Sequence, residues 1–287
     1  MTFWNNINYK IAALQSRLVL LIGVNIVVYL AVNVPAIIEW LFFRSDNIAA
    51  FSKYYLSLPA SLPQLLHRFW TPVTYMFMHD RIFHILFNML WLYWFGQIFE
   101  EFLGKKRTVG LYLLGGLAGG ALFIAAYNIF PAFADVRNGS TVVGASASVM
   151  AIVVGAATIA PNYTIMLFFL GPVKLKWIAL FYVVIDFLSI SGANAGGEIA
   201  HLGGAMLGFF YVRQVQKGND WIAGIVSIFK KKPHLKVAST NRDKAMSSRP
   251  RQDEVDAILD KISKSGYENL SKHEKEVLFR ASKHEES

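Results

Sequence analysis

The stretch VGASASVM, residues 143–150, places Ser146 between small residues at the head of a long charge-free run. No charged residue occurs from position 138 to position 173, and residues 144–160 read as the first half of a membrane-spanning helix. Backbone N–H groups in the first turn of a helix have no intrahelical acceptor, so an oxyanion forming beside Ser146 would meet donors already in place. Small residues also let membrane helices pack closely, so the motif needs a base before it indicates catalysis.

The composition is that of a multi-spanning membrane protein. Of the 287 residues, 54% are hydrophobic and only 16% are charged, and the mean hydropathy is +0.39. The absence of cysteine excludes a cysteine nucleophile, a thiolate metal site and a disulfide, which leaves serine or histidine for any chemistry. Much of the net charge of +9 lies in the last quarter of the chain. Attraction to anionic lipid explains this charge as well as a nucleic acid would, and we expect no nucleic-acid partner.

Six apolar segments predict an all-α polytopic membrane protein whose membrane domain covers residues 18–216. The segments are 18–38, 82–99, 109–128, 144–160, 177–190 and 198–212. Residues 1–17 form a short N-terminus, and the first span lacks a small-residue cleavage site, so we expect it to be retained. If the spans alternate in direction, basic residues at positions 10, 17, 105–107, 174 and 176 lie on one side, which predicts that both termini are cytoplasmic.

Four polar residues in or beside the spans are candidates for function. His84 and Asn88 lie four residues apart near the start of the second span, so both can donate hydrogen bonds to one acceptor. Bonding between helices is the structural alternative. His79, upstream, is interpreted as a loop-stabilising or interfacial histidine. Asp186, late in the fifth span, is either a proton-relay carboxylate or a loop anchor, and we favour the loop anchor.

The sixth span supplies a candidate base. Ala200, Gly204 and Gly208 recur every four residues and form a smooth face on which another helix can sit at backbone distance. His201 lies on the same stripe, so it can take a proton from a serine on the packed helix and return the proton to a leaving amine. Alone, His201 is equally well explained as a structural hydrogen-bond donor. Together with Ser146 it predicts a catalytic dyad.

Taken in chain order, these motifs resemble those of the rhomboid family of intramembrane serine proteases. The matching residues are His84 and Asn88 (HxxxN), Glu100 and Gly104 (ExxxG), Gly144 to Ala147 (GxSx), and Ala200, His201, Gly204 and Gly208 (AHxxGxxxG). The likeness covers about residues 70–208. It implies a six-helix core with Ser146 as nucleophile and His201 as general base and acid, without the orienting carboxylate of a triad. It also implies an oxyanion hole made of the Ser146 N–H and the side chains of His84 and Asn88.

The resemblance further implies a peptide hydrolase without cofactor or metal, in the inner membrane of a bacterial cell. Its partners would be transmembrane protein substrates and the lipid bilayer. The residues that would support the site are Gly144, Met150, Gly204 and Gly208. Met150 is a departure, because family members commonly carry an aromatic residue there, and a thioether packs against the histidine more loosely. A second departure is Trp70-Thr71, which replaces a common Trp-Arg pair and puts the anchoring of the first loop in doubt.

A catalytically inactive rhomboid-like protein that binds membrane clients is the alternative function. Such a protein would tolerate the loss of Ser146 or His201, and both are present. A small-solute transporter would show inverted repeats or facing charges at mid-membrane, and the sequence shows neither. The sequence therefore favours the enzyme.

Beyond the membrane domain the chain becomes polar and basic. We expect a basic linker at 217–250 and a small helical cytoplasmic tail at 251–287, similar to a tail appended to some bacterial rhomboids. Apolar residues at positions 255, 258, 259 and 262 have helical spacing, and Ser271 with Glu274 predicts a capping box. The tail therefore reads as a helical hairpin. Both partner binding and a plain solvated appendage remain open as its role.

Overall fold

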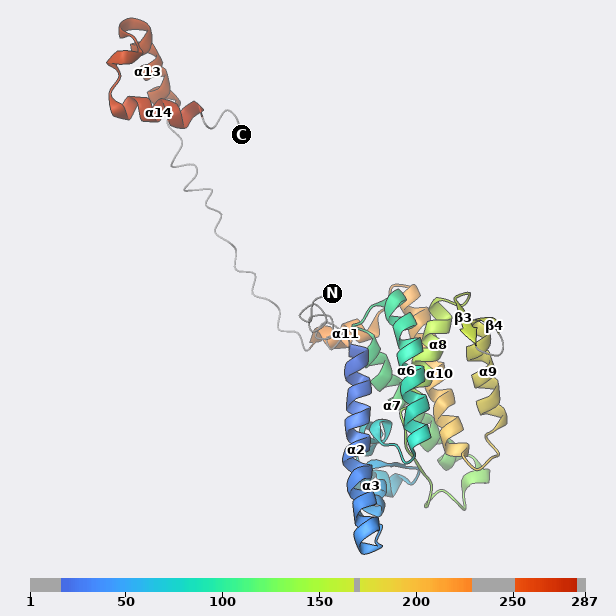
Figure 1. Cartoon of the computed structure of the whole chain (residues 1–287). Helices are drawn as coiled ribbons and strands as arrows, with labels where there is room; N and C mark the ends of the chain where they lie inside the picture. The colour runs from blue at the N-terminus through green and yellow to red at the C-terminus, as the bar shows by residue number, and fades with distance from the viewer. Residues whose placement is uncertain (1–16, 168–170, 229–250, 283–287) are drawn as a thin grey trace. The chain divides into compact units, whose positions relative to one another are not determined.

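The computed structural model describes residues 17–167, 171–228 and 251–282. The chain divides into two units, Met1–Lys230 and Lys231–Ser287. In the colours of Figure 1, the described part of the larger unit runs from blue to orange and that of the smaller unit is red.

Long helices form the larger unit and run side by side in Figure 1. They are α2 (Arg17–Phe43), α6 (Ile82–Leu103), α7 (Thr108–Ile129), α8 (Ser146–Ile159), α9 (Leu175–Leu188) and α10 (Ala195–Gln216). Among the described residues, α2, α6 and α7 are long and apolar enough to cross a membrane, and α8 is a shorter apolar helix. Each of the six predicted segments overlaps one of these helices, so the predicted all-α polytopic membrane fold is confirmed.

Short elements connect the helices. Between α2 and α6 lie α3 (Asn47–Leu56), β1 (Leu58–Pro59), α4 (Leu62–His67), α5 (Thr71–Thr74) and the 3-10 helix η1 (Tyr75–Phe77). Between α7 and α8 lie η2 (Pro131–Phe133) and β2 (Thr141–Val142), and β2 pairs antiparallel with β1. This pairing fixes the chain just before α8 to the α2–α6 connection. A second antiparallel pair, β3 (Thr164–Leu167) with β4 (Gly171–Lys174), links α8 to α9.

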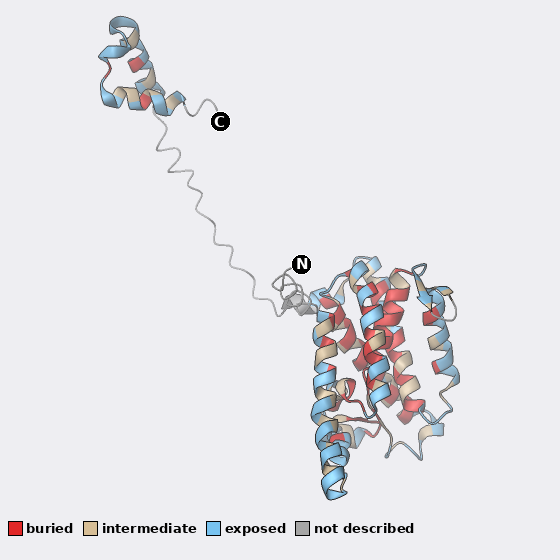
Figure 2. Ribbon diagram, viewed as in Figure 1, coloured by how far each residue is buried: buried red, intermediate tan, exposed pale blue. Residues whose placement is uncertain are grey.

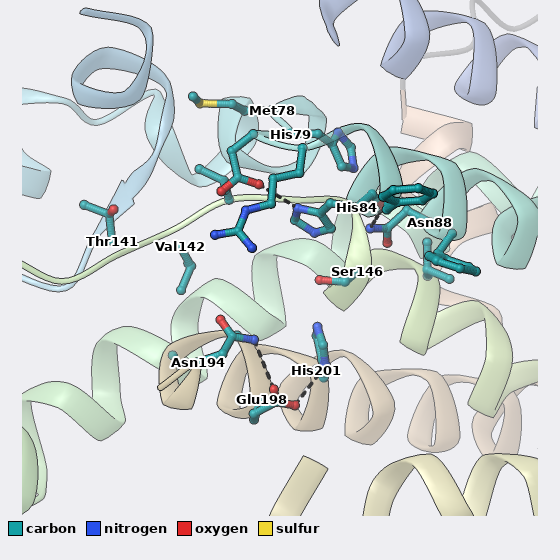
Figure 3. A pocket seen from close by; sticks show the side chains of 18 of the residues that line it. Met78, His79, His84, Asn88, Thr141, Val142, Ser146, Asn194, Glu198 and His201 are labelled. Carbon is teal, nitrogen blue, oxygen red and sulfur yellow. Dashed lines mark hydrogen bonds and ion pairs between the residues drawn. The ribbon is translucent and has the colours of Figure 1, made fainter. Parts of the chain in front are cut away.

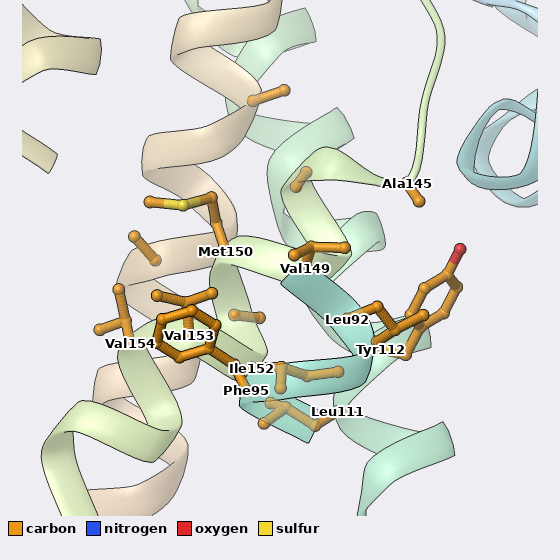
Figure 4. Packing of buried hydrophobic residues seen from close by; sticks show 14 of the residues in the cluster. Leu92, Phe95, Leu111, Tyr112, Ala145, Val149, Met150, Ile152, Val153 and Val154 are labelled. Carbon is orange, nitrogen blue, oxygen red and sulfur yellow. The ribbon is translucent and has the colours of Figure 1, made fainter. Parts of the chain in front are cut away.

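Helix α8 lies at the centre of the bundle, packed by α6, α7 and α10. Every residue from 147 to 157 is buried (Figure 2), and Figure 4 shows the side chains packed around this helix. A Cβ atom on Gly204 would lie 2.0 Å from the Ala147 carbonyl oxygen, and one on Gly208 would lie 2.1 Å from that of Ala151. The small-residue face predicted for the sixth span therefore brings α10 to backbone distance from the helix that carries Ser146.

The predicted bounds 144–160 agree with α8, but the expectation that this stretch is the first half of a longer spanning helix is wrong. Helix α8 has 14 residues and ends at Ile159, where the chain enters the β3–β4 pair. At a rise of about 1.5 Å per residue the helix is about 21 Å long, shorter than a hydrocarbon layer of about 30 Å. Figure 1 shows β3 and β4 at one end of the bundle. Ser146, at the other end of α8, therefore lies inside the bundle, short of the opposite membrane face.

The segment predicted as a linker begins with ordered structure. Helix α11 (Trp221–Ile228) falls inside it, and Ile222 is buried against Gly110 of α7. Arg107 Nε donates to Asp220 Oδ2 at 2.7 Å, and the Tyr211 hydroxyl donates to Asp220 Oδ1 at 3.0 Å. These contacts attach α11 to the membrane unit. The remainder of the predicted linker, 229–250, lies outside the described residues.

The smaller unit is a helical hairpin, as predicted. It comprises α13 (Gln252–Ser265), the 3-10 helix η3 (Tyr267–Asn269) and α14 (Lys272–Ser282), packed around Ile258, Leu270 and Val277. The Ser271 N–H donates to Glu274 Oε2 at 2.7 Å, and the Glu274 N–H donates to Ser271 Oγ at 3.3 Å. The predicted capping box is therefore confirmed.

Candidate active site

One cavity collects the polar residues that the sequence analysis singled out. It has a volume of about 1310 Å³ and is lined by Ser146 and Met150 from α8, His84 and Asn88 from α6, and His201 from α10. Figure 3 shows Ser146, His84, Asn88 and His201 around the same space. No hydrogen bond joins Ser146 to His201 within the described part of the chain, and contacts of this kind commonly tighten only when substrate binds. Three helices far apart in the sequence thus supply one polar site within an apolar bundle.

The chain enters α8 through a turn that requires glycine. Gly144 has φ +118°, and a Cβ atom there would lie 2.7 Å from His84 Nε2. The Gly144 N–H donates to the Tyr75 carbonyl at 2.8 Å, and the first helical bond runs from the Val149 N–H to the Ala145 carbonyl at 2.9 Å. The N–H groups of residues 146–148 therefore have no acceptor within the helix and are available to an anion beside Ser146.

His79 stabilises this turn. The Ala145 N–H donates to His79 Nε2 at 3.3 Å, and His79 Nδ1 lies 3.3 Å from the Phe77 carbonyl, so Nδ1 carries the proton. Burial, together with the neighbouring His84, lowers the pKa of His79 to about 4, which keeps the ring neutral near pH 7 and able to accept. Of the two interpretations of His79, the structure supports the loop-stabilising one.

His84 is held by a carboxylate that the sequence analysis missed. His84 Nδ1 lies 3.1 Å from Asp80 Oδ1, so the other ring nitrogen, Nε2, is left beside Gly144 at the head of α8. Burial alone would raise the pKa of Asp80, but the hydrogen bond and charge of His84 hold it below its usual value. With Nδ1 donating to Asp80, Nε2 can donate to an oxyanion only when both ring nitrogens carry a proton. The four-residue spacing from Asp80 to His84 was the available signal.

Asn88 lies one turn further along α6. Its amide Nδ2 donates to the His84 carbonyl at 2.8 Å, and its residue is only 8% exposed. The amide has a second N–H, because an asparagine side chain carries two donors. Asn88 and His84 thus stand together beside the cavity, as their spacing predicted.

Asp186 is where the sequence analysis was wrong. We expected it to anchor a loop, whereas its Oδ1 lies 3.2 Å from His201 Nδ1 and the residue is 5% exposed. Glu198, one turn before His201 on α10, has Oε2 at 3.6 Å from the same nitrogen, and its Oε1 accepts from Asn194 Nδ2 at 3.0 Å. Figure 3 shows the Asn194–Glu198–His201 chain. Asp186 comes from α9, so no spacing within one helix could reveal this contact.

Asp186, Glu198 and His201 each place one potential ligand atom within 4.8 Å of the others. Carboxylates and imidazole are ligands for several divalent metals. The same three groups are also explained without an ion, since one His201 nitrogen is shared by two carboxylates. The expectation that the site uses no metal stays a prediction, which activity in the presence of a chelator would test.

Comparison with known proteins decides the family. The Rhomboid domain matches residues 66–217, which is more than half of the chain and includes every site residue named above. The chain belongs to the rhomboid family. Residues 239–284 of this rhomboid match a family of unknown function, DUF6576.

Two curated relatives are rhomboid-like proteins. The RHOMBOID-like protein 12, mitochondrial, of Arabidopsis thaliana is 28% identical over 195 residues, which is 65% of this chain and 56% of that protein. The Presenilin-associated rhomboid-like protein A, mitochondrial, of Danio rerio is 27% identical over 214 residues, covering 73% and 49%. The chain therefore spans about half the length of these relatives.

The first loop of this rhomboid is anchored despite the missing Trp-Arg pair. Arg68 is 3% exposed, donates to the Tyr54 carbonyl and lies over the Tyr54 ring at 4.1 Å. Trp70 Nε1 donates to the Tyr55 carbonyl at 2.8 Å. Arg68, two residues before Trp70, thus holds the loop against α3, which resolves the doubt raised by Trp70-Thr71.

Proposed function

We propose that this rhomboid is an intramembrane serine endopeptidase that hydrolyses a peptide bond in or next to a substrate's transmembrane helix. The observation that carries the proposal is that Ser146 and His201 line one cavity within an apolar bundle. His201 Nδ1 is engaged by Asp186, so Nε2 is the ring nitrogen left to accept the Ser146 proton.

The proposed reaction follows from these positions. Ser146 Oγ attacks the carbonyl carbon, its proton passes to His201 Nε2, and the carbonyl electron pair moves onto oxygen. His201 then gives the proton to the leaving nitrogen as the C–N bond breaks. Water then loses a proton to the same nitrogen and attacks the acyl carbon, and that proton passes to Ser146 Oγ as the bond from the acyl carbon to Oγ breaks. The Ser146 N–H with the side chains of His84 and Asn88 would hold the oxyanion in both steps.

The substrate has to expose a peptide bond that a helix normally shields. Local unwinding exposes the bond, and it costs least in transmembrane helices that contain Gly, Pro or other helix breakers. Gly144 and Ala147 flank Ser146 and leave little room for bulk, which supports a preference for a small residue just before the cut. With both termini in the cytoplasm, the connection between α7 and α8 lies on the outer side of the membrane, so we place the cut towards the outer membrane face.

We propose a multi-pass protein of a bacterial inner membrane with both termini in the cytoplasm. The support is the excess of basic residues on one side of the spans. The two relatives carry "mitochondrial" in their names, which describes those proteins. Single cysteines introduced into this cysteine-free chain test the orientation: a tail cysteine should be protected from an external thiol reagent, and labelling from outside would contradict it.

The activity is tested with purified protein in liposomes and a model single-span substrate. Wild type should cut the substrate, with or without EDTA, and Ser146→Ala and His201→Ala should both be inactive. Ser148→Ala is the matched control, because Ser148 lies in the same helix turn and its residue is fully buried. Cutting by Ser146→Ala would refute the site.

A client-binding protein without protease activity is the second candidate. The two relatives are named rhomboid-like. Membership of the family does not by itself establish protease activity. If wild type fails on every substrate but retains a single-span helix equally well with and without Ser146, the binding function replaces the enzyme.

A further inference from the structure

We propose that Asp186 is a positioning residue that fixes the tautomer of His201, behind the Ser146–His201 pair of this rhomboid. The inference rests on the proposed protease function and adds a residue to its machinery. It contradicts our own expectation from the sequence, in which His201 acted without a carboxylate.

The geometry is that of a carboxylate behind an imidazole. Asp186 Oδ1 lies 3.2 Å from His201 Nδ1. A carboxylate can only accept, so Nδ1 must carry the proton, and neutral His201 then presents an unprotonated Nε2 on the other side of the ring. An unprotonated Nε2 is what the attack by Ser146 requires, because it has to take the hydroxyl proton.

Because Asp186 is buried, a charge on its carboxylate would interact strongly with a neighbouring cation. The residue is 5% exposed, and its Oδ2 has no hydrogen-bond partner among the described residues. No lysine or arginine of the described chain lies within ion-pair distance of it. The imidazolium that forms at His201 during the attack is therefore the cation that Asp186 would contact. An interaction that strengthens when this charge appears stabilises the transition state more than the ground state.

Glu198 competes for the same nitrogen but fits the role less well. Its Oε2 is further away, at 3.6 Å, and its Oε1 is engaged by Asn194. Its side chain is 17% exposed, against 7% for Asp186. Glu198 also lies on the same helix as His201, whereas Asp186 approaches from α9 and so holds the ring from outside its own helix.

A purely structural role for Asp186 is the alternative. Asp186 is the one buried residue in the last two turns of α9, so its bond to His201 also ties this end of α9 to α10. In that role Asp186 would contribute to folding, and the rate of cleavage would not depend on which His201 tautomer is present. The two roles differ in what Asp186→Asn does, because asparagine has the same shape but offers a donor as well as an acceptor.

The test compares Asp186→Asn with three other proteins in the liposome assay. We expect kcat to fall at least about 100-fold with KM within twofold, since the same change in a serine protease triad costs about 10⁴-fold through the wrong tautomer. Glu198→Gln should cost less than tenfold. Asp135→Asn makes the same chemical change at an exposed carboxylate of the outer loop and should match wild type. A kcat of Asp186→Asn within threefold of wild type would overturn the inference.

A spectroscopic arm separates this inference from the proposed function. Nitrogen NMR of histidine-labelled protein, with the His201 signals assigned by their loss in His201→Ala, should show the proton on Nδ1 in wild type and on Nε2 in Asp186→Asn. A wild-type His201 protonated on Nε2 overturns the inference even if Asp186→Asn does not fold. If wild type cuts nothing, the protease proposal fails while the tautomer measurement still decides the role of Asp186.

Discussion

Helices α8 and α9 are both apolar and both 14 residues long, yet they are packed very differently. Eleven residues of α8 are buried, against four of α9. The difference follows side-chain size: α8 is built from Ala, Ser, Gly, Val, Ile, one Thr and one Met, whereas α9 carries Trp177, Phe181 and Phe187, all more than half exposed. Small residues let helices approach in a membrane, and large apolar ones face lipid at no cost.

The comparison separates two tasks within one site. The nucleophile starts the tightly enclosed helix, where its position is set by contacts on all sides. The carboxylate behind the base comes from the loosely covered helix, in which Asp186 is the one buried residue of the last two turns. We therefore expect substitutions around α8 to affect the fold, and substitutions on the outer face of α9 to be tolerated.

The largest effect should come from crowding the α8–α10 contact. Gly204→Ala places a Cβ atom 2.0 Å from the Ala147 carbonyl oxygen, a backbone atom, so one of the two helices has to shift. We expect a loss of unfolding free energy of about 3 kcal/mol or more. Gly23→Ala in α2 is the matched control, since nothing lies within 4 Å of its Cβ, and it should be neutral or slightly stabilising. Thermal unfolding in detergent measures both, and equal stability would contradict the packing argument.

The turn before α8 should be sensitive to acid through His79. In the folded protein the pKa of His79 is about 4, whereas an unfolded histidine takes up a proton near 6.5. Stability from neutral His79 is therefore complete above about pH 6.5 and declines as the pH falls toward 4, by about 3 kcal/mol in all. Relative to His79→Gln, which has no such titration, wild type should lose stability over this range. Parallel pH curves for the two proteins would contradict the assignment.

The donors on α6 should affect the rate more than the fold. Asn88→Ala and His84→Ala remove side chains beside the head of α8, and loss of one oxyanion donor costs roughly 10²-fold in kcat when it acts alone. A shared hole makes each single loss smaller than the double one. Turnover and thermal unfolding should be measured on the same preparations. Unchanged turnover in the double variant removes both residues from the mechanism.

The smallest effect should come from the outer face of α9. Phe181 is 60% exposed in the structure, so in a bilayer its ring meets lipid in the folded state. Phe181→Ala should change unfolding free energy by less than about 0.5 kcal/mol. A loss of 2 kcal/mol or more would show that α9 packs against something absent from the single chain.

The sequence predicted those features of the site that depend on residue spacing within a single helix. The four-residue spacing of His84 and Asn88 places them on one helix face. The four-residue spacing of Gly204 and Gly208 predicts close helix packing. The contact between Asp186 and His201 was not predicted, because the two residues lie on different helices. The pairing of α9 with α10 cannot be deduced from the residue spacing within either helix. The end of α8 at Ile159 agrees with the predicted bound of 160, but the strand pair that follows α8 was not predicted, because the apolar run continues through it. The contact between Asp80 and His84 could have been predicted from their four-residue separation in the sequence, but it was not.

The central claim is that Ser146 is a nucleophile activated by His201. The most direct measurement is covalent labelling with a serine-directed fluorophosphonate, followed by peptide mapping. The account predicts one modified residue, Ser146, in wild type, and no labelling on the same time scale in His201→Ala. Labelling at another serine, or labelling of Ser146 at an equal rate without His201, would contradict it.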